Sequence, residues 1–337
     1  MENNSERTPY HFGYRVSKSE EYPYGWKVID TKDINTKRPV VLCFGGNATI
    51  NTTYANGMAK HAERFLGVTP ENKFIDVYSI QYGGREGYET GNLTPDEITE
   101  ITKKLFLPLI IGKDNKRLET EIAAKNMRNI NILSYCYGEY AVNKMVNYTA
   151  QVMTKFFDYS EEETTKILSQ ILQVSYAPIV EPNKYTTNFE FRSLLDEQSA
   201  RRYEKEYLEQ TKQEEIPFIG CGQMHIKNNT VKFYAKSYDY ETKTTMDEHD
   251  IMIHRDENWN ALNKRADVAS QSLACILAMG VLNSKENQKN ANLIPLPSAK
   301  EIADLIQPTL DKENNSYFEQ QERDIFEKQK NNNLPQM

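Results

Sequence analysis

Residues 129–146, NINILSYCYGEYAVNKMV, change from a strand pattern to a helix pattern within a few residues. The apolar run INILSY is typical of a strand buried on both faces of a sheet. From Gly138 onward, apolar residues recur at spacings of three and four, which predicts a helix. A turn this sharp forces its apex residue, Cys136, into a strained backbone conformation and brings its neighbours two positions away close together. Ser134 and Gly138 are both small, as this turn requires.

The same alternation of strand and helix patterns extends over most of the chain. Apolar runs such as RPVVLCFGG and KFIDVYSIQYGG alternate with helical segments such as TPDEITEITKKLFLPLIIG. This pattern predicts an α/β fold with a mainly parallel central sheet and helices on both faces. Catalytic groups in such folds lie at the carboxyl ends of strands, where both CFGG and SYCYG are found.

Composition and charge suggest boundaries within the chain. Residues 1–37 are predicted as an N-terminal extension with edge strands, including EYPYGWKVID, and residues 38–285 as the main α/β domain. A charged amphipathic pattern over 190–214 predicts a helical cap at about 186–214, inserted over one end of the sheet. Residues 286–337 are predicted as a C-terminal helix and a flexible, polar tail.

Charge and hydropathy argue against several partners. The net charge is −7 and no Lys/Arg block occurs, so neither nucleic acid nor an anionic membrane surface is expected as a partner. No apolar stretch reaches the roughly 18 residues of a membrane span, and the start carries no secretory signal. A cytoplasmic protein is therefore expected. Export as a bacterial effector, directed by the Glu-rich tail, is a weaker alternative.

The four cysteines form neither a CxxC pair nor a cluster with zinc spacing, so no metal or cofactor is predicted. Cys43, Cys221 and Cys275 lie in apolar runs, where a free thiol packs as a small hydrophobic side chain. Cys136 differs because of the turn around it.

The spacing small–x–Cys–x–small around Cys136 is that of a nucleophile elbow. In SYCYG the chain resembles the α/β-hydrolase superfamily, in the cysteine variant found in dienelactone-hydrolase-like enzymes, with Ser134 where the first glycine is usual. The resemblance covers roughly residues 38–285 in element order. It implies that Cys136 is the nucleophile, and the N-terminus of the following helix favours its thiolate form. The alternatives are a buried structural thiol at 136, and Ser134 as a rival nucleophile.

The resemblance also implies an oxyanion hole. The backbone N–H of Tyr137 is one expected donor, and the N–H of Gly46 or Asn47 in the glycine loop CFGGNATINTTY is the other. Glycine at this position lets the backbone approach a substrate carbonyl. An ordinary strand-to-helix turn is the alternative for the loop alone.

The superfamily order of nucleophile, acid and histidine places the remaining triad members late in the chain. The segment before the last long helix offers His249, in the polar turn DEHD, and His254, which follows IMI; His249 is preferred. Asp239, at the end of VKFYAKSYD, is the preferred acid, and Asp247 is the alternative. A solvated loop carboxylate is the competing interpretation for either aspartate.

The function predicted from these features is hydrolysis of a small-molecule ester, thioester or lactone through a Cys-His-Asp triad and an acyl-enzyme intermediate. Acyl transfer would use the same groups, with the cap excluding water. The alternative from another class is a catalytically inactive binding or scaffold protein on the same fold, such as a secreted effector.

Overall fold

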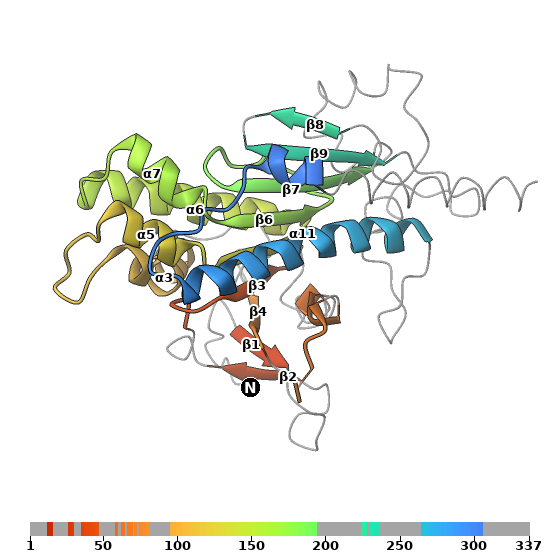
Figure 1. The fold of residues 1–337 in the computed structure, drawn as a ribbon, viewed down its shortest axis with the longest axis horizontal. Helices are drawn as coiled ribbons and strands as arrows, with labels where there is room; N and C mark the ends of the chain where they lie inside the picture. Colours follow the sequence, from red (N-terminus) through yellow and green to blue (C-terminus); the bar gives the residue numbers. More distant parts are fainter. Residues whose placement is uncertain are drawn as a thin grey trace, which may run out of the picture.

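The computed structural model describes residues 12–15, 26–29, 35–46, 58–59, 62–64, 66–69, 71–72, 74–80, 95–193, 224–227, 229–235 and 264–305. Its named strands form a nine-stranded sheet in the order β2-β1-β4-β3-β5-β6-β7-β9-β8 (Figure 1). The strands are β1 (Phe12–Arg15), β2 (Trp26–Ile29), β3 (Val40–Phe44), β4 (Asp76–Ile80), β5 (Ile130–Tyr135), β6 (Leu172–Tyr176), β7 (Thr187–Ser193), β8 (Met224–Lys227) and β9 (Thr230–Ala235).

The six central strands, β4, β3, β5, β6, β7 and β9, pair in parallel. β1, β2 and β8 add antiparallel pairs at the two edges. The named helices are α3 (Pro95–Leu105), α4 (Leu107–Ile110), α5 (Thr120–Met127), α6 (Tyr137–Phe156), α7 (Glu161–Leu168) and α11 (Lys264–Lys289). The predicted α/β fold with a mainly parallel sheet is confirmed.

Helices α6 and α11 cover opposite faces of the sheet. Side chains alternate between the two faces along a strand, so positions 131 and 134 of β5 point in opposite directions. Asn131 donates a hydrogen bond from Nδ2 to Ser284 Oγ on α11 (3.1 Å), whereas Ser134 Oγ donates to Glu139 Oε2 on α6 (2.9 Å). The packing of α11 on β5 and β6 is close: a Cβ at Gly280 would lie 2.1 Å from Leu172 Cδ2.

Over β6, β7 and β9, the face toward α11 is mostly apolar, whereas the face toward α6 is partly polar. On β7, Phe189 and Phe191 point to the α11 side, and Asn188, Glu190 and Arg192 to the other. This alternation corrects the predicted cap. The helical cap predicted at about 186–214 is wrong for Thr187–Ser193, because these residues form a central strand whose charged residues line one face. Residues 194–214 lie outside the described residues.

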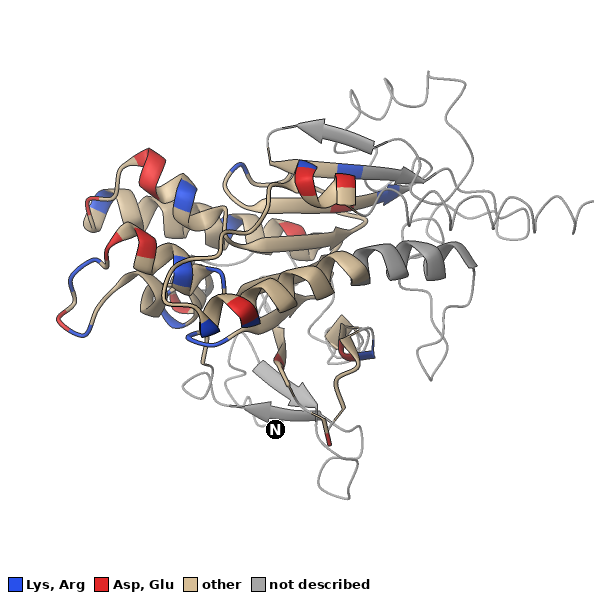
Figure 2. Cartoon of the chain, viewed as in Figure 1, with Lys and Arg blue, Asp and Glu red and all other residues tan. Residues whose placement is uncertain are grey.

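The hydropathy of the helices and the distribution of charged residues are two further features of the structure. None of the helices in the described ranges is long and apolar enough to cross a membrane. Charged residues of both signs gather on α5 and α7, whereas β3, β5 and β6 carry none (Figure 2). Cys43 is buried, as expected for a thiol in an apolar run, whereas Cys275 is exposed although it also lies in an apolar run. An apolar run does not show which side of a helix faces the core. Cys221 lies outside the described residues.

Candidate active site

Cys136 stands between the last residue of β5 and the first residue of α6, at the carboxyl edge of the parallel strands. Its backbone angles are φ 53° and ψ −118°, the strained conformation expected at the apex of the turn. A non-glycine residue in such a region costs about 1–3 kcal/mol and persists only where the surroundings impose it. Backbone outliers of this kind cluster at active sites, so the strain supports a functional role for the turn.

Contacts with β3 and β6 impose the turn. A Cβ at Gly138 would lie 2.4 Å from the carbonyl oxygen of Phe44, so the first turn of α6 touches the backbone at the end of β3. The Cys136 N–H donates to the carbonyl oxygen of Tyr176 at the end of β6 (3.0 Å). The requirement for a small residue at 138 therefore has a direct cause, because a side chain there would push α6 away from β3.

The glycine loop after β3 lies against the same turn. A Cβ at Gly46 would be 3.0 Å from Cys136 Cβ and 3.0 Å from the Tyr135 ring. Tyr137 is the first residue of α6, and the N–H groups of a first helical turn point toward the N-terminal end of the helix. The structure thus brings Gly46, Cys136 and Tyr137 together. Asn47 lies outside the described residues.

The predicted base and acid also lie outside the described residues: His249, His254, Asp239 and Asp247. They follow β9 in the chain, and two strands, β6 and β7, separate β9 from β5. At about 4.8 Å per strand, the end of β9 is about 14 Å from the end of β5. The segment after β9 must therefore cross the carboxyl ends of β6 and β7 for an imidazole to reach Cys136.

Among the cysteines in the described ranges, Cys136 and Cys43 are buried. Cys136 exposes 7% of its surface and belongs to the core cluster. Cys43, the residue before the last in β3, is fully enclosed, and burial raises the pKa of its thiol well above the usual value. Cys43 is therefore held as an inert thiol, while Cys136 lies at the carboxyl edge of the parallel strands.

The buried carboxyl group of Glu139, which the sequence did not point to, lies directly below the elbow. Ser134 Oγ donates to Glu139 Oε2 (2.9 Å), Ser175 Oγ donates to the same oxygen, and Gln173 Nε2 donates to Oε1 (2.6 Å). Burial, together with the negative charge of Glu190, raises the pKa of Glu139 to about 7, although these three hydrogen bonds act in the opposite direction. The signal in the sequence is weak, because an acid in the first turn of a helix is usually solvated.

The same contacts describe the surroundings of the Ser134 hydroxyl. Its hydroxyl is fully buried, bonded to Glu139 and 2.7 Å from Ser175 Oγ. This position supports its interpretation as the small residue that the elbow requires, and it gives no support to Ser134 as the nucleophile.

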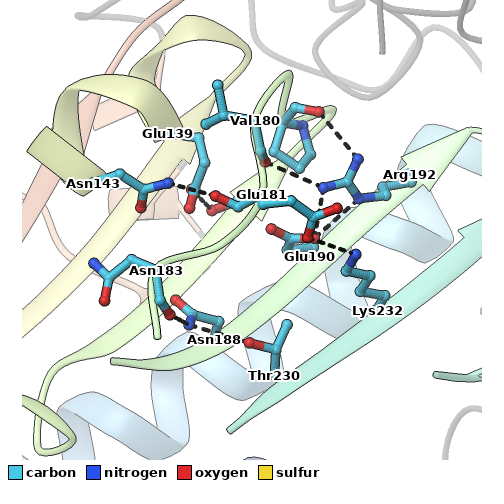
Figure 3. A network of polar contacts seen from close by, with 12 residues as sticks. Glu139, Asn143, Val180, Glu181, Asn183, Asn188, Glu190, Arg192, Thr230 and Lys232 are labelled. Atoms are coloured by element: carbon cyan, nitrogen blue, oxygen red, sulfur yellow. Dashed lines mark hydrogen bonds and ion pairs between the residues drawn. The ribbon is translucent and has the colours of Figure 1, made fainter. Parts of the chain in front are cut away.

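Beside this group, buried charges continue across the sheet (Figure 3). Ser175 is in register with Glu190, and Glu190 with Lys232. Glu190 forms a buried ion pair with Arg192 (2.8 Å), and Lys232 pairs with Glu181 (3.1 Å). The region next to the elbow is therefore a row of compensated charges on the α6 face of the sheet.

Neither the comparison with models of protein families nor the search of curated proteins finds a match for this chain. Within the described ranges, no group of three His, Cys, Asp or Glu side chains is placed to hold a metal ion. Because a fold alone does not determine function, the function is inferred from the geometry of the elbow.

Proposed function

We propose that the chain is a hydrolase of the α/β-hydrolase type that cleaves an ester, thioester or lactone through Cys136. One observation carries the proposal: a cysteine with φ 53° and ψ −118° lies between a central parallel strand and a helix, with a glycine loop packed against it. A structural cysteine has no need of this strained position, and ligand sites in open parallel sheets lie at this edge.

The chemistry follows from the groups around the elbow. The Cys136 sulfur attacks the substrate carbonyl carbon, and its proton passes to the imidazole of His249, which Asp239 orients. The backbone N–H groups of Tyr137 and of Gly46 or Asn47 hold the oxyanion of the tetrahedral intermediate. The imidazole returns the proton to the leaving alcohol or thiol as the carbon–heteroatom bond breaks. Water then attacks the acyl-enzyme with the same imidazole as base, which restores the thiol.

Turnover of chromogenic esters and thioesters with short and long acyl chains tests this proposal. Cys136→Ala should lower kcat/KM by about 10³-fold or more, because the nucleophile is lost. His249→Ala should do the same and His254→Ala should not, which separates the two candidate bases. Cys275→Ser is the matched control: it removes an exposed thiol far along the chain and should leave turnover unchanged. Undiminished turnover by Cys136→Ala would refute the mechanism.

One observation favours the alternative, a binding protein without catalytic activity: Cys136 exposes only 7% of its surface. The two functions differ in a direct measurement, the stoichiometric burst of product when enzyme is mixed with excess chromogenic ester. With an ester whose acylation is faster than its deacylation, an acyl-enzyme intermediate gives a burst equal to the amount of protein, and its mass shift maps to the peptide that contains Cys136. A binding protein gives neither.

A further inference from the structure

Glu139 connects the elements that shape the elbow. It is the third residue of α6, its N–H donates to the carbonyl oxygen of Cys136 (3.3 Å), and its side chain is fully buried. Its carboxyl group accepts hydrogen bonds from Ser134, two residues before Cys136 on β5, and from Ser175 on β6. The next residue of β6, Tyr176, accepts the N–H of Cys136. One carboxyl group thus braces both strands that flank the apex.

Burial of the Glu139 carboxyl group is unfavourable in free energy if its only role is to hold the fold. A buried carboxyl group loses its hydration, and apolar side chains of similar volume often fill such a position at no loss of stability. The hydroxyls of Ser134 and Ser175, which would otherwise need other partners, both point at one carboxylate oxygen. The polar group is therefore better explained by what it does to the elbow than by packing.

Few charges face Glu139 from the neighbouring elements. β5 and β6 contribute only neutral groups, the hydroxyls of Ser134 and Ser175 and the amide of Gln173. β7 contributes Glu190, a like charge paired with Arg192, and β9 contributes Lys232, which is paired with Glu181 (Figure 3). The nearby cations are thus engaged by other acids, and Glu139 is stabilised mainly by neutral donors.

We propose that Glu139 is a positioning residue for Cys136: it fixes the elbow by bridging β5 and β6, and the charge of its carboxyl group sets how readily the thiol reacts. The inference rests on Cys136 being the reactive thiol of the proposed function. When Glu139 is ionised, its negative charge in the first turn of α6 opposes formation of a second negative charge on the sulfur. When it is protonated, that opposition is absent.

The pH at which this change occurs lies within the working range of a cytoplasmic enzyme, because burial and Glu190 raise the pKa of Glu139 to about 7. Alkylation of Cys136 should therefore show an inflection at the ionisation of Glu139. Removal of the Glu139 charge should remove this inflection.

The experiment measures the rate of Cys136 alkylation by iodoacetamide between pH 5.5 and 9, with each modified peptide quantified by mass spectrometry. Iodoacetamide is uncharged, so the protein charge does not steer the reagent. All variants carry Cys275→Ser, because that exposed thiol would compete for the reagent. Glu139→Gln keeps the shape of the side chain, and the two serine hydroxyls can turn to accept hydrogen bonds from the new amide.

We expect Glu139→Gln to match the wild-type rate at pH 6, where Glu139 is mostly neutral, and to exceed it by about 3- to 10-fold at pH 8. Ser175→Ala gives an independent shift: it removes a hydrogen bond that lowers the pKa of Glu139, so the inflection should move to higher pH. Glu163→Gln is the matched control, because Glu163 lies in a hydrogen-bond network at the start of α7 with Arg117 and Thr120. It should leave the profile unchanged.

The outcomes separate this inference from the proposed function. Coincident profiles for wild type, Glu139→Gln and Ser175→Ala, with Cys136 alkylated in all three, would overturn the role of Glu139 and leave the hydrolase proposal standing. If the pH profile of Cys136 alkylation differs from that of wild type in both Glu139→Gln and Ser175→Ala, the positioning role of Glu139 is supported, even if one variant is less stable. Failure of Cys136 to react at any pH would overturn both the hydrolase proposal and this inference.

Discussion

Glu139 is expected to make folding stability depend on pH. Its pKa is about 7 in the folded chain, compared with an ordinary value of 4.5, so the folded state binds its proton more tightly than the unfolded state. The stability that it contributes is fully present below about pH 4.5 and is lost as pH rises through about 7. A shift of this size corresponds to about 3 kcal/mol between the two limits.

We therefore expect Glu139→Gln to flatten the dependence of stability on pH. The variant should be more stable than wild type at pH 8, by up to about 3 kcal/mol, and closer to it at pH 5.5. Urea denaturation at these two pH values measures the difference. An equal change in unfolding free energy between pH 5.5 and 8 in both proteins would show that Glu139 is not the titrating group.

At the scale of single residues, local spacing in the sequence was enough to predict the sharp turn at Cys136. It was not enough to predict the buried carboxyl group of Glu139 below that turn. Ser134, Cys136 and Gly138 are separated by two positions each, and the sterics of the turn act over that distance. Glu139 is followed in the sequence by a helix with a normal amphipathic pattern, so its burial depends on Ser175 and Gln173 from a strand more than thirty residues later. Spacing within one segment contains no such information.

Arg128 connects the start of β5 to α11 and should be essential for the packing of that helix. Its buried guanidinium donates to Asn131 Oδ1 (2.9 Å), to the carbonyl oxygen of Gln170 (2.8 Å), to Asn283 Oδ1 (2.6 Å) and to the carbonyl oxygen of Gly280. Loss of hydration lowers the pKa of Arg128 to about 9. These four partners are neutral, and their oxygens have been brought out of water with the guanidinium.

Arg128→Met should therefore lower the free energy of unfolding by about 3–5 kcal/mol, because it leaves several buried acceptors without a donor. Lys125→Met is the control: Lys125 is only half-buried and donates to the carbonyl oxygens of Asn290 and Ala291 near the same end of α11. It should cost less than about 1 kcal/mol. Chemical denaturation gives the energies, and faster hydrogen exchange in α11 would locate the effect. Similar losses in the two variants would contradict this role.

At the scale of elements, a helix can carry its end signal in its own sequence. For α7, Ser160 Oγ accepts the Glu163 N–H (3.1 Å) and Glu163 Oε2 accepts the Ser160 N–H (2.8 Å), the capping box that its sequence suggests. β7 was missed because Glu190 and Arg192 have charges that are unusual in a central strand. They are tolerated there because they pair with each other.

At the scale of the whole molecule, alternation of strands and helices predicted a parallel sheet, but it could not predict strand order. The order depends on pairings between distant segments, such as β7 with β9 and β1 with β4. The predicted boundary at residue 38 separates the N-terminal residues from the α/β domain. In the structure β1 pairs with β4, and β2 with β1, so both strands extend the same sheet.

The pairing of β1 with β4 makes the boundary at residue 38 testable. Phe12 pairs with Ile80 and Gly13 with Ser79, and the β4 residues Val77, Tyr78 and Ile80 are buried. Removal of residues 1–34 would turn β4 into an edge strand with unpaired backbone groups, a template for association with another chain. We expect this truncation to lower the melting temperature by about 5 °C or more and to cause self-association.

Removal of residues 1–10 is the matched control, because it shortens the same end of the chain and retains both edge strands. Light scattering with size-exclusion chromatography, together with thermal denaturation, distinguishes the two truncations. If the chain that starts at residue 35 is monomeric and melts as the full chain does, the sheet is complete without β1 and β2 and the domain begins near residue 38. If only this chain associates and melts early, β1 and β2 are a structural part of the domain. Their role is then to protect the edge of β4, on the side of the sheet away from β7 and β9.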